Sequence, residues 1–116
     1  MDPTIDSLTR SLRAFAAERE WEQFHSPKNL ACALSVEAAE LLEHFQWLTE
    51  EQSRQLTPQQ LAAVGHEAAD VLLYLLQLAD RLGIDLAAAA RDKIELNARK
   101  YPASQVRGSS RKYTDR

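Results

Sequence analysis

The sequence has little cysteine, glycine or proline, and it lacks long uncharged apolar runs. A single cysteine, Cys32, excludes a disulfide within the chain and is consistent with a reducing compartment. Three glycines and four prolines are few for a turn-rich β fold. No apolar run reaches the roughly 18 residues of a membrane span. The first twenty residues carry acidic groups without a continuous apolar segment, unlike a signal peptide. We therefore expect a soluble, cytoplasmic protein.

Charge is distributed unevenly along the chain. Residues 1–90 contain 6 basic and 14 acidic side chains, whereas residues 91–116 contain 8 basic and 3 acidic ones. An acidic body followed by a basic segment is consistent with an anionic ligand held beside metal-binding carboxylates, although a solvated tail without a role would have the same composition. Because the basic segment is short and the body is acidic, we expect no stable binding of nucleic acid.

Four helical segments account for most of the 116 residues, a length typical of one domain. The segments run approximately over residues 4–20, 27–48, 58–82 and 86–100, and the expected caps are Ser26, Thr57 with Gln60, Gly83 and Asp85. No convincing strand pattern is present. We expect an all-α domain over residues 1–102 and an irregular basic tail over residues 103–116. A helical chain this short often completes its core by oligomerising.

Two of the predicted helices carry matching pairs of carboxylates. The second helix contains Glu37-Ala-Ala-Glu40, and the third contains Glu67-Ala-Ala-Asp70, 30 residues later. At about 100° per residue, Glu37 and Glu67 fall on the edge of the apolar stripe of their helices. Glu40 and Asp70 fall about 60° to the other side. The acids of each pair therefore border the expected core.

Neither pair has a basic side chain within helical reach. The residues three or four positions from Glu37 and Glu67 are apolar or acidic, so the carboxylates repel one another, and partial burial makes ionisation more costly. A divalent cation would neutralise all four acids, and oxygen donors favour Mg²⁺, with Mn²⁺ as a substitute. One such pair is common on a solvated helix face, whereas two matching pairs indicate a metal site. His44 and His66 lack the spacing of a di-iron bundle, and the single cysteine with three histidines gives no zinc cluster.

Aromatic and basic side chains accompany the acidic pairs. Trp47 and Tyr74 project near the carboxylates of their helices, and Trp21 lies in the segment before the second helix. Planar side chains beside a metal suit a nucleobase or another flat ring, whereas ordinary packing is the alternative for each. Lys93 and Asn97 share a face of the fourth helix, where they could hold phosphate oxygens or form a solvated basic face. No glycine-rich phosphate loop is present.

The chain resembles the MazG-like all-α nucleotide pyrophosphohydrolases, and among them the dCTP pyrophosphatase branch. The resemblance covers nearly the whole sequence. It is carried by the two acidic motifs and by four further segments: Arg-Glu-Trp-Glu-Gln-Phe-His at 19–25, Phe-Gln-Trp at 45–47, Lys-Tyr-Pro at 100–102 and Ser-Ser-Arg-Lys-Tyr at 109–113.

The resemblance implies a fold, a cofactor and a set of site residues. The fold is a four-helix MazG-like bundle completed by oligomerisation, as a homotetramer or dimer of dimers whose sites draw on neighbouring protomers. The catalytic domain would be residues 1–102. The ligands of Mg²⁺ would be Glu37, Glu40, Glu67 and Asp70. The substrate would contact Trp21, His25, Trp47 and Tyr74 around the base, and Lys93 and Asn97 near the phosphates.

The resemblance also implies a reaction. A (deoxy)nucleoside triphosphate, with dCTP or a modified dCTP preferred, is hydrolysed between its α and β phosphates to a monophosphate and pyrophosphate, a nucleotide-pool house-cleaning activity. Many members outside this branch have two consecutive glutamates at the start of the first motif, whereas here Val36 precedes Glu37. The catalytic candidates are therefore Glu37 and Glu40. We favour Glu40 as the general base, because it lies off the core edge beside Trp47.

Two alternatives remain open at the level of sequence. The same fold could act on another nucleotide, such as dUTP or phosphoribosyl-ATP, because base choice depends on a few pocket contacts. The chain could instead be a non-catalytic helical interaction module. In that case, alanine at the four acids would leave binding of a protein partner intact.

Overall fold

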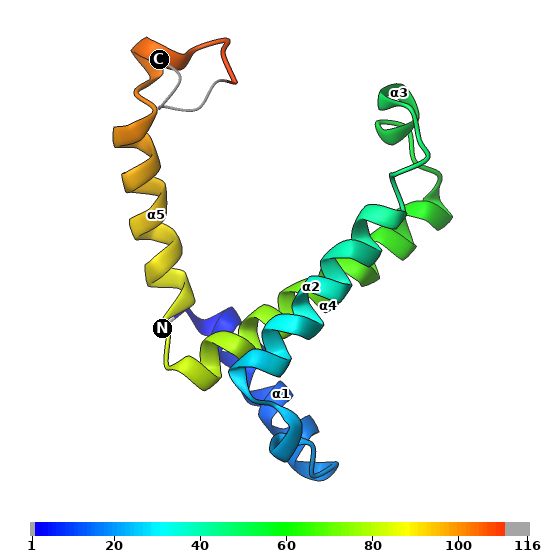
Figure 1. Cartoon of the computed structure of the whole chain (residues 1–116), viewed down its shortest axis with the longest axis vertical. Coiled ribbons are helices and arrows are strands. Elements are labelled where there is room, and N and C mark those ends of the chain that lie inside the picture. The colour runs from blue at the N-terminus through cyan, green and yellow to red at the C-terminus, as the bar shows by residue number, and fades with distance from the viewer. Residues whose placement is uncertain (1, 111–116) are drawn as a thin grey trace.

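The computed structural model describes residues 2–110 and contains helices without strands in that range (Figure 1). The α-helices are α1 (Pro3–Glu18), α2 (Pro27–Glu43), α3 (Glu50–Ser53), α4 (Pro58–Leu82), α5 (Leu86–Lys100) and α6 (Ala103–Val106), and one 3₁₀ turn, η1 (Glu22–Phe24), precedes α2. The expectation of an all-α protein is confirmed for these residues. The last part of the predicted basic tail, residues 111–116, lies outside the described residues.

The expected caps begin and end the long helices. The Ser26 hydroxyl accepts a hydrogen bond from the backbone of residue 29, and α2 then begins. Thr57 and Gln60 form a reciprocal capping box at the start of α4. At the other end of α4, Gly83 has φ 68°, a left-handed conformation that glycine adopts without a steric penalty. Asp85 caps α5.

The second helix ends earlier than the apolar pattern predicts. We expected it to reach residue 48, but α2 ends at Glu43. The following backbone forms tighter turns, in which the amides of Phe45 and Leu48 each bond to a carbonyl three residues earlier, at 2.9 Å. Thr49 caps α3 in an extended conformation, with ψ 165°. The chain must therefore leave the α-helical conformation before residue 49. Phe45 and Leu48 continue the apolar spacing of α2, but this spacing alone does not keep the backbone helical.

Part of the segment expected to be irregular is helical. Residues 103–106 form the single turn α6, which follows Pro102. The backbone amides of Gln105 and Val106 both donate to the carbonyl of Pro102, at 2.9 and 3.2 Å. The fixed φ of Pro102, −58°, suits the start of such a turn, so the proline that ends α5 also begins α6.

The long helix α4 organises the fold. It packs along α2 in the opposite direction, and α1 crosses it near its C-terminal half (Figure 1). By length and composition α4 is the one helix in residues 2–110 that could cross a membrane, a test that core helices of soluble proteins also pass. Here its middle carries the acids Glu67 and Asp70, and its sides face α2 and α1. These features fit a helix that packs within a protein.

One chain does not close a four-helix bundle, because α5 projects away from the other long helices (Figure 1). The small buried core is formed mainly by Leu30, Leu76, Ala16 and Ala79. The accessible surface is 8852 Å², against about 6,400 Å² for a compact monomer of this mass. The radius of gyration is 17.7 Å, against about 13 Å for a compact domain of this length. Large apolar side chains stay exposed, among them Val36, Leu42, Trp47, Leu61, Leu72, Ile94 and Leu96.

Candidate active site

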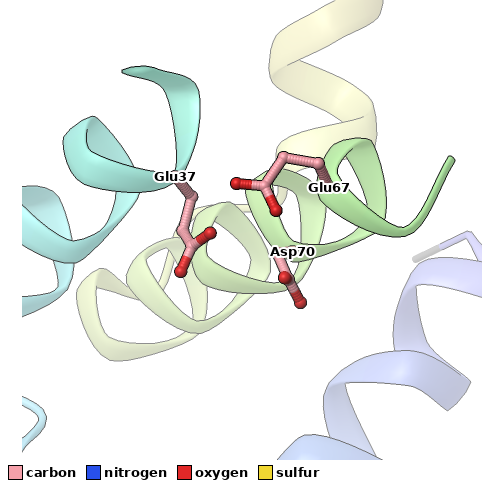
Figure 2. Close-up of side chains that lie close together, drawn as sticks. All are labelled: Glu37, Glu67 and Asp70. Atoms are coloured by element: carbon pink, nitrogen blue, oxygen red, sulfur yellow. The ribbon is translucent and has the colours of Figure 1, made fainter. Parts of the chain in front are cut away.

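Three carboxylates from two helices converge in the middle of the α2–α4 pair. Glu37 comes from α2, and Glu67 and Asp70 come from α4. One oxygen of each lies within 4.8 Å of the others. Figure 2 shows the carboxyl groups of Glu37 and Glu67 turned toward each other between the two helices. Two segments that lie 30 residues apart in the sequence thus form one acidic cluster.

Glu40 also belongs to this neighbourhood. Its carboxylate is the main reason that the pKa of Glu67 is raised to about 7, followed by burial of Glu67 and the proximity of Glu37. The pKa of Glu37 is raised as well, first by burial and then by Glu40. Raised pKa values mean that the folded chain resists placing this many negative charges together. The four predicted metal ligands therefore lie in one region, with Glu40 exposed and outside the tight group of three.

Two oxygens of the cluster are buried without a partner. Glu37 Oε2 and Glu67 Oε1 make no hydrogen bond within residues 2–110. None of the ion pairs in that range involves the four acids. A buried carboxylate oxygen without a donor is costly, and a cation would satisfy both oxygens. An all-oxygen donor set of this kind fits a hard divalent ion such as Mg²⁺ or Mn²⁺.

A cleft of about 430 Å³ opens beside the acids, between α1, the residues that flank η1, and α4. Asp70 lines one part of it, and Trp21, His25 and Tyr74 line the rest. Three of the residues expected to contact the base therefore share a cavity with one of the expected metal ligands. Trp21 is held in place by an edge-on contact with Phe15, with ring centroids 5.7 Å apart.

Three other predicted substrate residues do not reach this cleft in a single chain. Trp47 lies in the turn after α2, beyond the far end of that helix, and is 86% exposed. Lys93 and Asn97 are exposed on α5, which points away from the acids (Figure 1). In a single chain these three residues therefore lie apart from the cleft beside Asp70.

The sequence analysis missed the contribution of α1 to the cleft. The residues of α1 that line it are Leu8, Ser11, Leu12, Phe15 and Ala16, and α4 adds Leu73 and Gln77. The apolar spacing of this segment was used only to predict a helix, and Phe15 is 46% exposed. The available signal was the run from Phe15 to Trp21, where two aromatic rings bracket the end of the helix. The polar residue Gln77, seven positions after Asp70, was the other signal.

Comparisons with known proteins identify the family of the chain. The sequence profile of the MazG-like family matches residues 32–115. The chain is 47% identical to human dCTP pyrophosphatase 1 and 45% identical to the bovine protein of that name, over 98% of this chain and 68–69% of those proteins. The crystal structure of a pyrophosphatase from Archaeoglobus fulgidus, 41% identical, superposes with a TM-score of 0.81 over 88% of this chain and 95% of that one. The chain belongs to the MazG-like family, and its all-helical fold is the MazG-like fold.

Proposed function

We propose that this protein is a metal-dependent nucleoside triphosphate pyrophosphohydrolase that prefers dCTP. The observation that carries the proposal is the convergence of Glu37, Glu67 and Asp70 beside an aromatic-lined cleft. A cation bound by the acids attracts a polyphosphate, and the aromatic side chains suit a base. The names of the human and bovine relatives support the same reaction and the same substrate. By hydrolysing dCTP or a modified dCTP, the enzyme would remove that nucleotide from the cellular pool, which is a house-cleaning activity.

Mg²⁺ is the proposed cofactor, and Mn²⁺ is a substitute. Glu37, Glu67 and Asp70 would hold it directly, with Glu40 at the edge of the site. When bound, the ion neutralises phosphate oxygens and lowers the pKa of water next to it. The pKa values of Glu37 and Glu67 are raised, so these acids hold protons more readily than usual. Binding of a cation between them displaces those protons.

Glu40 is the proposed general base. It is exposed, and it lies close enough to Glu67 to raise the pKa of that residue, so it borders the metal site without being enclosed by it. Its carboxylate takes a proton from a water molecule whose oxygen attacks the α-phosphorus. The bond between the α-phosphorus and the bridging oxygen breaks, and pyrophosphate leaves. Trp21 and Tyr74 hold the base in the cleft meanwhile.

We also propose that the working form is a homo-oligomer, a tetramer by family resemblance. The surface of 8852 Å² exceeds that of a compact monomer by roughly 2,500 Å², and exposed apolar side chains occur on α2, α4 and α5. Assembly would complete the bundle and bring Trp47, Lys93 and Asn97 of one copy toward the cleft of another. Light scattering coupled to gel filtration measures the mass. A monomer at micromolar concentration would contradict this part of the proposal.

The natural environment of such an enzyme is the free nucleotide pool. We propose that it works in the cytoplasm. We also propose that it forms no stable complex with nucleic acid, because residues 1–90 carry a net charge of −8. A mobility-shift assay with single- and double-stranded DNA at physiological salt tests the second statement. Retention of DNA at micromolar protein would contradict it.

The reaction is tested by product analysis. The purified protein is incubated with each common NTP and dNTP, with dUTP and with phosphoribosyl-ATP, in the presence of Mg²⁺ or of a chelator. Monophosphate and pyrophosphate, formed only with metal and fastest from dCTP, are the expected products. Fastest turnover of dUTP or phosphoribosyl-ATP would keep the reaction and replace the substrate. Release of orthophosphate, or no turnover, would exclude the proposed reaction.

A further inference from the structure

Gln77 lies on the same face of α4 as the metal-site acid Asp70. Tyr74 falls between them, and all three line the cleft beside α1. Seven residues of α-helix correspond to an axial separation of about 10.5 Å and to nearly two full turns. A nucleoside extends from its α-phosphate by one ribose and one base, a length comparable with two helical turns. With the phosphates near Asp70 and the ring beside Tyr74, the far edge of the base comes to Gln77.

The amide of Gln77 is oriented by its own helix. Its Nε2 donates to the backbone carbonyl of Leu73 at 3.3 Å, in a partly buried position. Its Oε1 accepts no hydrogen bond from residues 2–110. Because the nitrogen is engaged by the backbone of α4, the oxygen is the polar group of Gln77 that stays available to a ligand in the cleft. The neighbouring wall is largely apolar, with Leu8, Leu12 and Leu73, so a free acceptor there is selective for a ligand that donates.

Cytosine and uracil differ at the atom that such an acceptor would meet. Cytosine carries an exocyclic amino group at position 4, which donates hydrogen bonds, whereas uracil and thymine carry an oxygen there, which only accepts. We propose that Gln77 determines the preference for cytosine, its Oε1 accepting a hydrogen bond from the 4-amino group. This assignment rests on the proposed function, because it takes the cleft to be the base site of a nucleotide hydrolase.

The energetic consequence is a discrimination against uracil. Two facing acceptors repel, and the glutamine oxygen loses water without gaining a donor, so dUTP binds less well than dCTP. One unsatisfied buried polar group lowers kcat/KM by about 10- to 100-fold. The effect should appear in the ratio of the two substrates, since the metal, the phosphates and the ribose are common to both.

The test uses three variants of Gln77 and its helix. Gln77→Leu keeps a side chain of similar volume and removes both polar groups. Gln77→Glu keeps the acceptor and removes the donor. The matched control is Gln59→Leu, an exposed position of α4 that does not line the cleft. For each protein, kcat/KM is measured with dCTP and dUTP, and the affinities for dCMP and dUMP are measured by calorimetry with Mg²⁺ present. Circular dichroism confirms that each variant is folded.

We expect Gln77→Leu to lower the dCTP-to-dUTP ratio of kcat/KM by about 10-fold or more, while Gln77→Glu and Gln59→Leu keep it. A ratio that is unchanged in Gln77→Leu would overturn the assignment. A ratio lost in Gln77→Glu would also overturn it, because the donor would then be the recognising group. If the wild-type protein hydrolyses nucleoside triphosphates and only the ratio fails to respond, the proposed function stands without this residue. If the wild-type protein neither hydrolyses nor binds nucleotides, the proposed function and the assignment both fail.

Discussion

Replacing Glu67 by glutamine should remove a specific dependence of stability on pH. The pKa of Glu67 is raised from 4.5 to about 7, because Glu40 lies beside it and because it is partly buried. Between these values the folded chain binds a proton more tightly than the unfolded chain does. The stabilisation is fully present below pH 4.5 and is lost as the pH rises through about 7. The metal-free protein should therefore melt at a lower temperature at pH 8 than at pH 5.

Divalent cations should reverse this trend. Cation binding displaces the proton of Glu67, so the affinity for Mg²⁺ rises up to about tenfold per pH unit below about pH 7 and then becomes constant. At a Mg²⁺ concentration 100 times the dissociation constant, binding stabilises the folded state by about 2.7 kcal/mol. For a domain of this size, that corresponds to a rise in Tm of about 10 °C. The gain should be larger at pH 8 than at pH 5.

Thermal unfolding followed by circular dichroism, at one fixed protein concentration, measures both effects. The wild-type protein, Glu67→Gln and the control Glu51→Gln are compared with a chelator and with Mg²⁺. Asp80 does not interfere, since Arg13 lowers its pKa from 3.8, and the stability it adds is lost only below that pH. A wild-type minus Glu67→Gln difference in Tm that is constant from about pH 5 to 8 would refute the electrostatic reasoning. Equal stabilisation of both proteins by Mg²⁺ would refute the metal site.

Three further predictions concern the general base, an ion pair and the core. Glu40→Gln should lower kcat by about 10²–10⁴-fold, and near-normal turnover at saturating Mg²⁺ would exclude Glu40 as the base. Arg13 binds Asp80 through two hydrogen bonds, at 2.9 and 2.5 Å, and joins α1 to α4. Alanine at either residue should lower the midpoint of urea unfolding only slightly, because both side chains are partly exposed. The exchange Arg13→Asp with Asp80→Arg should restore much of this loss, and no recovery would mean that the pair itself is not stabilising. Leu76→Ala removes a fully buried side chain and should cost about 2–5 kcal/mol, whereas the same change at exposed Leu61 should cost much less.

The local structure was predictable from the sequence because its causes are local. The capping box at Thr57 and the left-handed glycine at position 83 fix the ends of α4 through contacts within a few residues. The carboxylates were predicted to border the core because helical periodicity is the same in any fold. The early end of α2 was not predicted. Thr49 needs an extended backbone to cap α3, and the helical periodicity of apolar residues does not indicate where such a cap interrupts the helix.

The shape of the site was less predictable because it depends on how the helices are placed relative to each other. The direction that α5 takes after Gly83 determines how far Lys93 lies from the acids of its own chain. The helical pattern of α5 does not predict that direction. His25 lies between helices, where periodicity is uninformative, and only the family resemblance drew attention to it. The packing of α1 against α4, which makes the cleft, brings together residues far apart in the sequence, such as Arg13 and Asp80, which are 67 positions apart.

The antiparallel arrangement of α2 and α4 gives the acidic cluster an approximate local symmetry. Because the helices run in opposite directions and carry the same motif, a half-turn about an axis through the cluster roughly exchanges Glu37 with Glu67, and Glu40 with Asp70. A site on such an axis would be equally open on two sides. The first helix removes this equivalence, because α1 packs on α4 and encloses a cleft beside Asp70, while Glu40 stays outside it. The N-terminal helix thus gives a nearly symmetric pair of helices a polarity, because the cleft that it lines lies on the Asp70 side of the acids.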